Sequence, residues 1–293
     1  MERDSSACVT CPFAIAAQHS SLQHKAIHGH PFSAPMLNAA LAFPALAQFV
    51  PYQRFRDTHL AHHQDATLTD PYDDPESHYL ARGDWDGLPG WLRLVLDTNN
   101  TLVGRLFIGP IVGQTVWMGA DWRAARSGNR RVIHGWLMHL PAVAMVVAVV
   151  LLSPMPLTAY LGASYLGLSL LKIRRFLEHQ AHEKARGRTV VIDDRRALAL
   201  LFLSNNLHAV HDLHPRVPWY RLPELYRADP QRHLSLNEGY RYPSYAEIFA
   251  RHLLQAKDPV PHPLLRLEPS VAVAEAVHPV GPLITHDPAL EAR

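Results

Sequence analysis

The 293-residue chain contains little cysteine and almost no net charge. Its two cysteines, Cys8 and Cys11, exclude a disulfide framework, and a single CxxC pair favours two incidental thiols over a zinc or redox site. The formal net charge of +2 gives no basic excess of the kind that binds nucleic acid. Residues 1–19 carry a short apolar run without a basic segment before it, so they predict neither a spanning helix nor a secretory signal.

Histidine is the residue in excess, with 20 copies. Many of them fall in clusters at residues 24–30, 59–63 and 205–214, and a Glu178-His179 pair precedes the last cluster. Spacings of three and four residues place two imidazoles on one face of a helix. Because neutral imidazole is the commonest metal-binding side chain, the clusters predict one shared metal centre. Five isolated histidines are interpreted as packed or solvated: His19, His78, His134, His139 and His233.

Two apolar runs, Val132–Leu152 and Leu157–Leu171, are separated by a short segment with two prolines. Basic residues flank both outer ends and none lies in the turn, a pattern that predicts a membrane-embedded helical hairpin with both ends cytoplasmic. The alternative is a buried pair of helices in a soluble protein. The flanking residues are Arg123, Arg126, Arg130 and Arg131 before the hairpin and Lys172, Arg174 and Arg175 after it.

Three other segments have weaker patterns. The apolar stretch 31–51 joins two histidine clusters that must share one side of the membrane, and it is too short to cross about 30 Å twice at 1.5 Å per residue. We therefore expect it to lie at the membrane interface or to dip in and return, with a buried helix pair as the alternative. The acidic stretch 67–86 is interpreted as a solvated surface loop rather than a cation site. Residues 258–293 are rich in proline and predict a poorly ordered tail.

Taken in order, four segments resemble the histidine boxes of the membrane fatty acid desaturase superfamily, which also includes alkane hydroxylases and carotenoid ketolases and hydroxylases. The segments are HKAIHGHP, RDTHLAHHQD, RRFLEHQAH and NNLHAVHDLHPRVPWYRLP. The likeness covers residues 19–254. It implies a non-haem di-iron centre, O2 as co-substrate, and a lipid or acyl substrate. It also implies a separate ferredoxin-, rubredoxin- or cytochrome-type electron donor and an integral protein of the inner membrane whose metal site faces the cytoplasm.

The resemblance also implies a ligand set. Carried over box by box, it consists of His24, His28, His59, His62, His63, His179, His208 and His211, with Asp212 where the third box normally ends in histidine. Breaking an aliphatic C–H bond needs cofactor chemistry that side-chain acids and bases cannot supply, and nitrogen-rich sites suit iron among other metals. Asp57, Asp65 and Glu178 are candidates for carboxylates that orient the imidazoles.

The chain departs from the family pattern at three points. Lys25 stands where an acidic residue is usual, Asp212 replaces a histidine, and only 23 residues precede the first box where two spanning helices are usual. These departures predict a truncated start or a degenerate relative. They leave four hypotheses: an acyl desaturase, a hydroxylase or ketolase of an alkane or carotenoid, a non-catalytic relative, and a soluble histidine-rich metal-binding protein.

The expected fold is all-α: a membrane-embedded helical hairpin with a cytoplasmic helical cap that carries the histidine boxes. Three parts are expected along the chain. Residues 1–18 form a short N-terminal segment, residues 19–254 form the desaturase-like membrane domain, and residues 255–293 form the proline-rich tail.

Overall fold

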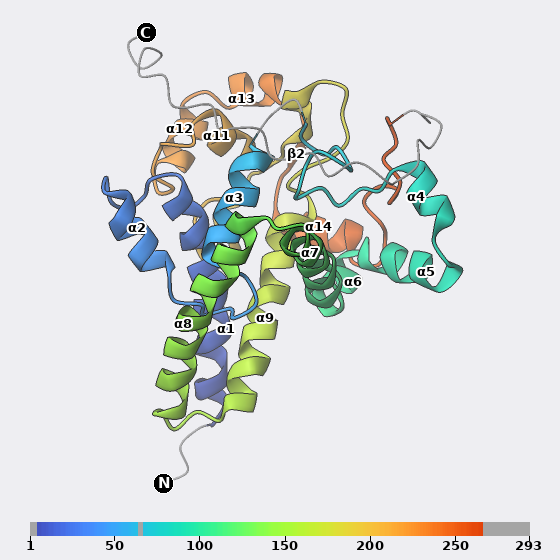
Figure 1. Ribbon diagram of the computed structural model, residues 1–293. Coiled ribbons are helices and arrows are strands. Elements are labelled where there is room, and N and C mark those ends of the chain that lie inside the picture. Colours follow the sequence, from blue (N-terminus) through green and yellow to red (C-terminus); the bar gives the residue numbers. More distant parts are fainter. Residues whose placement is uncertain (1–4, 64–66, 266–293) are drawn as a thin grey trace.

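The computed structural model describes residues 5–63 and 67–265, and these residues are mostly helical, as predicted (Figure 1). Three long helices lie side by side as a bundle: α1 (Ser5–Ile27), α8 (Arg130–Leu151) and α9 (Leu157–Phe176). α8 and α9 run antiparallel and form the predicted helical hairpin. The side chain of Asn129 begins α8 by accepting hydrogen bonds from the backbone N–H groups of Arg131 and Val132, at 3.1 and 3.2 Å.

Among the described helices, α8 is the one long and apolar enough to cross a membrane. α9 was predicted to be a second spanning arm, but it does not meet this criterion. α9 carries polar side chains along its length: Ser164 and Ser169 are buried within the protein, and Lys172 lies near its C-terminal end. The side chain of Ser164 donates a hydrogen bond to the carbonyl of Leu46 at 3.3 Å. Polar and small side chains of α9 thus pack within the bundle.

α1 is longer than the sequence pattern suggested and passes through the expected boundary between residues 18 and 19. It packs closely along α9, where a Cβ added at Gly167 would lie 2.9 Å from the Cβ of Ala16 and 3.0 Å from the carbonyl oxygen of Phe13. Only a glycine permits this approach. Residues 5–18 thus belong to the same bundle as the remainder of the chain rather than to a separate segment.

Shorter helices make up the remainder of the described protein. Before the hairpin come α2 (Pro35–Ala42), α3 (Tyr52–His62), α4 (Arg82–Gly87), α5 (Gly90–Asn99), α6 (Leu102–Phe107) and α7 (Gly109–Arg126). After it come the 3-10 helix η1 (Ala185–Arg188), β1 (Val191–Ile192), α10 (Ala197–Leu201), α11 (His208–Leu213), α12 (Leu222–Ala228), α13 (Pro230–Leu236), β2 (Arg241–Tyr242) and α14 (Tyr245–His252). β1 and β2 pair in parallel and are the small exception to the all-α expectation.

The cap is built around two buried apolar clusters. One surrounds the end of α9 and includes Phe176, Leu177, Phe202 and Ile248. The other packs β1 against α11 and α12 through Val191, Leu207, Val210, Leu222 and Tyr226. Burial of this apolar surface fixes α11, which carries the third histidine box, over the end of the bundle.

The segment between α2 and α3 packs on the hairpin, and the expected disordered tail needs correction. The segment after α2 reaches α8 and α9, since the backbone carbonyls of Leu46 and Gln48 accept hydrogen bonds from Tyr160 (2.6 Å) and His139 (2.7 Å). The expected tail is packed as far as residue 265: the backbone N–H of Leu80 donates to the carbonyl of Val260 at 3.0 Å, and Lys257 is buried. Residues 266–293 lie outside the described part of the chain.

Candidate metal centre

Four separate segments bring the predicted ligands to one place at the junction of bundle and cap (Figure 1). The C-terminal end of α1 carries His24 and leads into His28, and the end of α3 carries the HxxHH box. His179 follows the end of α9, and α11 carries the third box. All nine residues that the sequence suggested as ligands therefore lie together.

A first group of ligand atoms is formed by His24, His28, His59 and His63, whose ring nitrogens lie within 4.8 Å of one another. Nε2 of His59 lies 3.2 Å from Nε2 of His28 and 2.9 Å from Nε2 of His63. The ring of His211 lies 4.6 Å from that of His28 between centroids. Two nitrogens bound to one metal at about 2.1 Å lie about 3 Å apart when their bonds are near a right angle, so this spacing fits a shared ion.

A second group consists of Glu178, His179 and His208, also within 4.8 Å. Nε2 of His62 lies 2.9 Å from Nε2 of His179 and joins this group. The carboxylate of Asp212 lies between the two groups, with Oδ1 3.8 Å from Nδ1 of His63 and 3.7 Å from Nε2 of His208. The geometry thus offers two neighbouring positions for metal ions with a carboxylate between them.

The buried ring nitrogens test whether a metal fits. Both ring nitrogens of His24 and both of His211 are buried without a hydrogen-bond partner among the described residues. Buried polar atoms are nearly always satisfied, because leaving one unpaired costs roughly 1–3 kcal/mol. The donors are imidazoles with carboxylates, a set that suits iron among the transition metals. A metal ion in the first position would take one ring nitrogen of each of these two histidines as a ligand.

The protonation state also suits a metal. Burial and the neighbouring histidines lower the pKa of His28 to about 2 and that of His63 to about 3. The pKa values of the remaining histidines of the centre, apart from His62, are lowered as well, chiefly by burial; these are His24, His59, His179, His208 and His211. All of them are neutral at pH 7, the form that offers a lone pair to a metal.

His62 differs because its Nδ1 makes a short hydrogen bond to a carboxylate. Burial alone would lower its pKa, but the hydrogen bond to Asp74 and the charges of Glu76 and Asp74 outweigh burial and raise the pKa to about 9. Its Nδ1–H donates to Oδ1 of Asp74 at 2.7 Å, which leaves Nε2 facing His179. This positive charge belongs to the metal-free site, since metal binding releases the proton of a ligand.

Two orienting carboxylates come from the acidic stretch that was interpreted as a solvated loop. Asp74 is buried, and its Oδ2 accepts a hydrogen bond from the backbone N–H of Thr69 at 2.9 Å. Oε1 of Glu76 lies 3.6 Å from Nδ1 of His59, and Oε2 accepts from Arg175 at 2.7 Å. The solvated-loop interpretation was therefore wrong for these two residues. The available signal was the concentration of acidic residues directly after the HxxHH box.

Of the three carboxylates proposed to orient the imidazoles, Glu178 lies at the centre. It is buried, accepts a hydrogen bond from Asn205 at 2.7 Å and lies 3.5 Å from Nε of Arg174. Asp57 instead pairs with Arg54 and Arg56 on its own helix. Asp65 falls outside the described residues.

Lys25, the unusual residue of the first box, is fully buried beside the centre. Its Nζ donates a hydrogen bond to Oδ1 of Asn205 at 3.2 Å, and the same Asn205 holds Glu178. Burial and the charge of Arg174 lower its pKa to about 7, while Asp212 and Glu178 act in the opposite direction. Lys25 therefore forms part of the hydrogen-bond network of the centre.

The comparisons with known proteins agree with this geometry. No curated protein matches the chain. The family model described as fatty acid desaturase matches residues 6–244, a span that contains all nine gathered residues and most of the described elements. The chain belongs to the fatty acid desaturase family.

Proposed function

We propose that this protein is a membrane-bound, non-haem di-iron oxidoreductase that desaturates a fatty acyl chain with O2. The observation that carries the proposal is the convergence of eight histidines and Asp212 into two adjacent ligand groups in a desaturase-family chain. Bound iron would supply the activation of O2 that removes hydrogen from unactivated carbon. The overall reaction is balanced when one CH2–CH2 unit, O2, two electrons and two protons give one CH=CH unit and two waters.

In this proposal each ion takes one ligand group. His24, His28, His59, His63 and His211 would hold the first ion, and His62, His179 and His208 would hold the second. Asp212 would serve as a ligand in place of a histidine. Asp74 would hold the imidazole of His62 through its hydrogen bond so that Nε2 faces the metal position, and Glu76 lies 3.6 Å from Nδ1 of His59.

We also propose the arrangement in the membrane. α8 enters the hydrocarbon layer with α9 packed beside it, and the basic residues at both outer ends of the hairpin support a cytoplasmic position for the cap and its metal centre at the inner membrane. The catalytic domain corresponds to residues 19–254 together with the part of α1 that precedes them. Electrons come from a separate ferredoxin-, rubredoxin- or cytochrome-type donor.

A single-turnover experiment tests the reaction. The full chain is purified in detergent, loaded with Fe²⁺, reduced with dithionite without oxygen, freed of dithionite, and then given O2 with phospholipids and free fatty acids. Mass spectrometry should find a product that has lost two hydrogens, in an amount that falls to background in His62→Ala. A product that has gained oxygen would favour the hydroxylase alternative. Iron-loaded protein that consumes no acyl substrate of either kind contradicts the proposal.

A further inference from the structure

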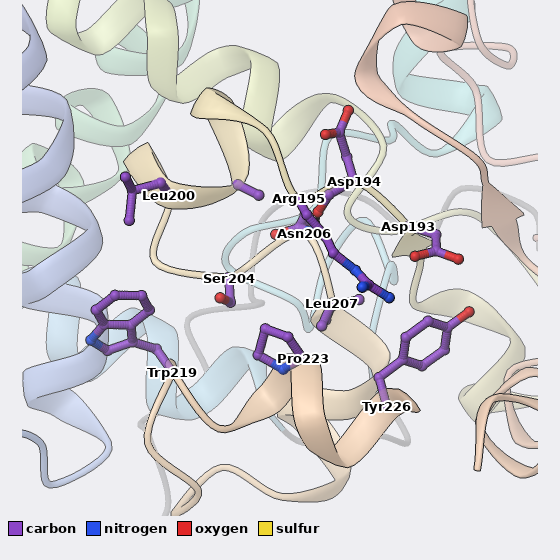
Figure 2. Close-up of a pocket in the computed structure, with 11 residues that line it drawn as sticks. Asp193, Asp194, Arg195, Leu200, Ser204, Asn206, Leu207, Trp219, Pro223 and Tyr226 are labelled. Carbon is purple, nitrogen blue, oxygen red and sulfur yellow. Dashed lines mark hydrogen bonds between the residues drawn. The ribbon is translucent and has the colours of Figure 1, made fainter. Parts of the chain in front are cut away.

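A cavity of about 180 Å³ adjoins the chain segment that leads into His208, and Figure 2 shows its lining residues. Its apolar and aromatic walls come from α10, α12 and the connections between them, with the residues Ala199, Leu200, Leu207, Trp219, Pro223 and Tyr226. Leu200 is 60% exposed, so the cavity is accessible from that side. Cavities that enclose small-molecule ligands are usually about 300–1,000 Å³, so this one is better matched to a single large side chain.

The wall of the cavity is connected to the metal centre through the chain. Leu207 is followed by His208, so one peptide bond separates a wall residue from a ligand residue. The turn before them holds Leu203 and Ser204 at φ angles of 50° and 55°, a left-handed backbone that non-glycine residues adopt at a cost. Asn206 fixes this turn by donating hydrogen bonds to the carbonyls of Ile192 (2.7 Å) and Asp194 (2.9 Å).

The charges at the mouth of the cavity are unbalanced. Its two carboxylates are already neutralised, since Asp194 pairs with Arg196 and Asp193 pairs with Arg241, each at 2.9 Å. Two exposed arginines have no such pairing: Arg195 lines the cavity, and Arg221 lies in the chain between the wall residues Trp219 and Pro223. Within residues 5–63 and 67–265 neither has a carboxylate partner. Figure 2 shows the Arg195 side chain between Asp193 and the aromatic ring of Tyr226.

We propose that this cavity and its arginine rim are the docking site for an acidic, one-electron carrier protein, which inserts one apolar side chain into the cavity. The proposal rests on the function proposed above, because that reaction consumes two electrons. The cysteines Cys8 and Cys11 cannot ligate an iron–sulfur cluster with four thiolates, and the proposal assigns electron delivery to a separate carrier protein. Two docking events deliver the two electrons, and each leaves one carrier molecule oxidised. The exposed arginines attract acidic carboxylates, while the apolar cavity provides the central anchor typical of an interface hot spot.

Binding to defined carriers tests the docking site without requiring catalysis. Full-length protein in nanodiscs is titrated with plant-type [2Fe–2S] ferredoxin, rubredoxin and a soluble cytochrome b5 domain, all acidic, and with basic cytochrome c as a charge control. At least one acidic carrier should bind, with a Kd that rises with salt, while cytochrome c does not. The double variant Arg195→Glu/Arg221→Glu should weaken that binding about tenfold or more. Trp219→Ala should weaken it with little change in the salt dependence.

Arg82→Glu is the matched control, because this exposed arginine lies on α4 outside the cavity and pairs with Asp86. It should leave carrier binding unchanged. Equal effects of Arg82→Glu and the double variant, or no binding of any acidic carrier at low salt, overturn the docking proposal. A loss of binding to phosphatidylglycerol vesicles in the double variant, with carrier binding intact, also overturns it and assigns the arginines to lipid. In the single-turnover experiment dithionite supplies the electrons, so that experiment does not need a docked carrier. If acyl turnover succeeds but no carrier binds, the docking site is refuted and the proposed function stands.

Discussion

At the residue scale, the centre depends on which nitrogen of each imidazole faces inward. His62 uses Nδ1 to donate to Asp74, and His59 points Nδ1 toward Glu76, so both present Nε2 to neighbouring histidines. A carboxylate in this position sets the tautomer and increases the basicity of the ligand. The chemistry of the centre therefore extends to a loop that supplies no ligand itself.

Replacing Asp74 with asparagine should weaken metal binding about 10- to 100-fold, because the amide cannot act as a charged acceptor for the Nδ1–H of His62. Asp73→Asn is the matched control, since Asp73 is adjacent but exposed. Competition with a chelator for Fe²⁺ or Co²⁺ measures the change in affinity. Equal affinities for the two variants would show that Asp74 does not orient His62.

The sequence revealed the histidines of the centre because their spacing follows the helix repeat and the boxes are local. It did not reveal Asp74 and Glu76, because a short acidic stretch with two prolines is typical of a solvated loop, and only the fold brings it against α3 and α9. Asp57 illustrates the opposite error, since its proximity in sequence to the HxxHH box did not place it beside an imidazole.

At the scale of elements, the bundle depends on close contact between α1 and α9. The sequence of α1 has no long apolar run, so its helix could not be predicted from hydropathy alone, and tertiary packing on α9 accounts for its length. Because the end of α1 carries His24 and leads into His28, a change in this packing displaces two predicted ligands. α9 similarly leads directly into Glu178 and His179.

Gly167→Ala should destabilise the protein and reduce its metal content, because the added methyl would overlap Ala16 and the backbone of Phe13. We expect a cost of roughly 1–3 kcal/mol, typical of overpacking. Gly162 lies on the same helix with nothing within 4 Å of an added Cβ, so Gly162→Ala should be neutral or stabilise by up to about 1 kcal/mol. Thermal unfolding in one detergent compares the two variants. Equal melting temperatures would contradict the packing argument.

At the scale of the whole molecule, the C-terminal part of the described chain secures the cap to the centre. Lys257 donates a hydrogen bond to the backbone carbonyl of His179 at 2.6 Å, and Asp258 accepts one from the hydroxyl of Tyr79. Tyr79 in turn accepts a hydrogen bond from the backbone N–H of Ala181 at 2.9 Å. Composition alone predicted a disordered tail here, because proline content does not report these long-range contacts.

The pH dependence of stability should reflect Asp258. Burial would raise its pKa, but the charges of Lys257 and His78 and the Tyr79 hydroxyl outweigh burial and lower it to about 2. A carboxylate with a lowered pKa stabilises the folded state above its unfolded pKa, and this contribution is lost as the pH falls toward 2. Asp258→Asn should lower the free energy of unfolding by up to about 2 kcal/mol at pH 7. The difference in free energy of unfolding between this variant and the unmodified protein should shrink below about pH 4.

Denaturation of Asp258→Asn and of the unmodified protein, followed from pH 7 to pH 3, measures whether their free energies of unfolding become equal. Asp86→Asn serves as the control, because Asp86 is exposed and pairs only with Arg82 on its own helix. A difference between Asp258→Asn and the unmodified protein that stays constant over the whole range would show that the charge of Asp258 does not stabilise the fold.

The most direct test of the account is the iron content of full-length protein purified in detergent, with His62→Ala prepared in parallel. Elemental analysis should find about two irons per chain, one for each ligand group, and a clear loss in the variant. Little iron in the unmodified protein after loading with Fe²⁺, or an equal iron content in His62→Ala, would contradict a di-iron centre built from the histidine boxes.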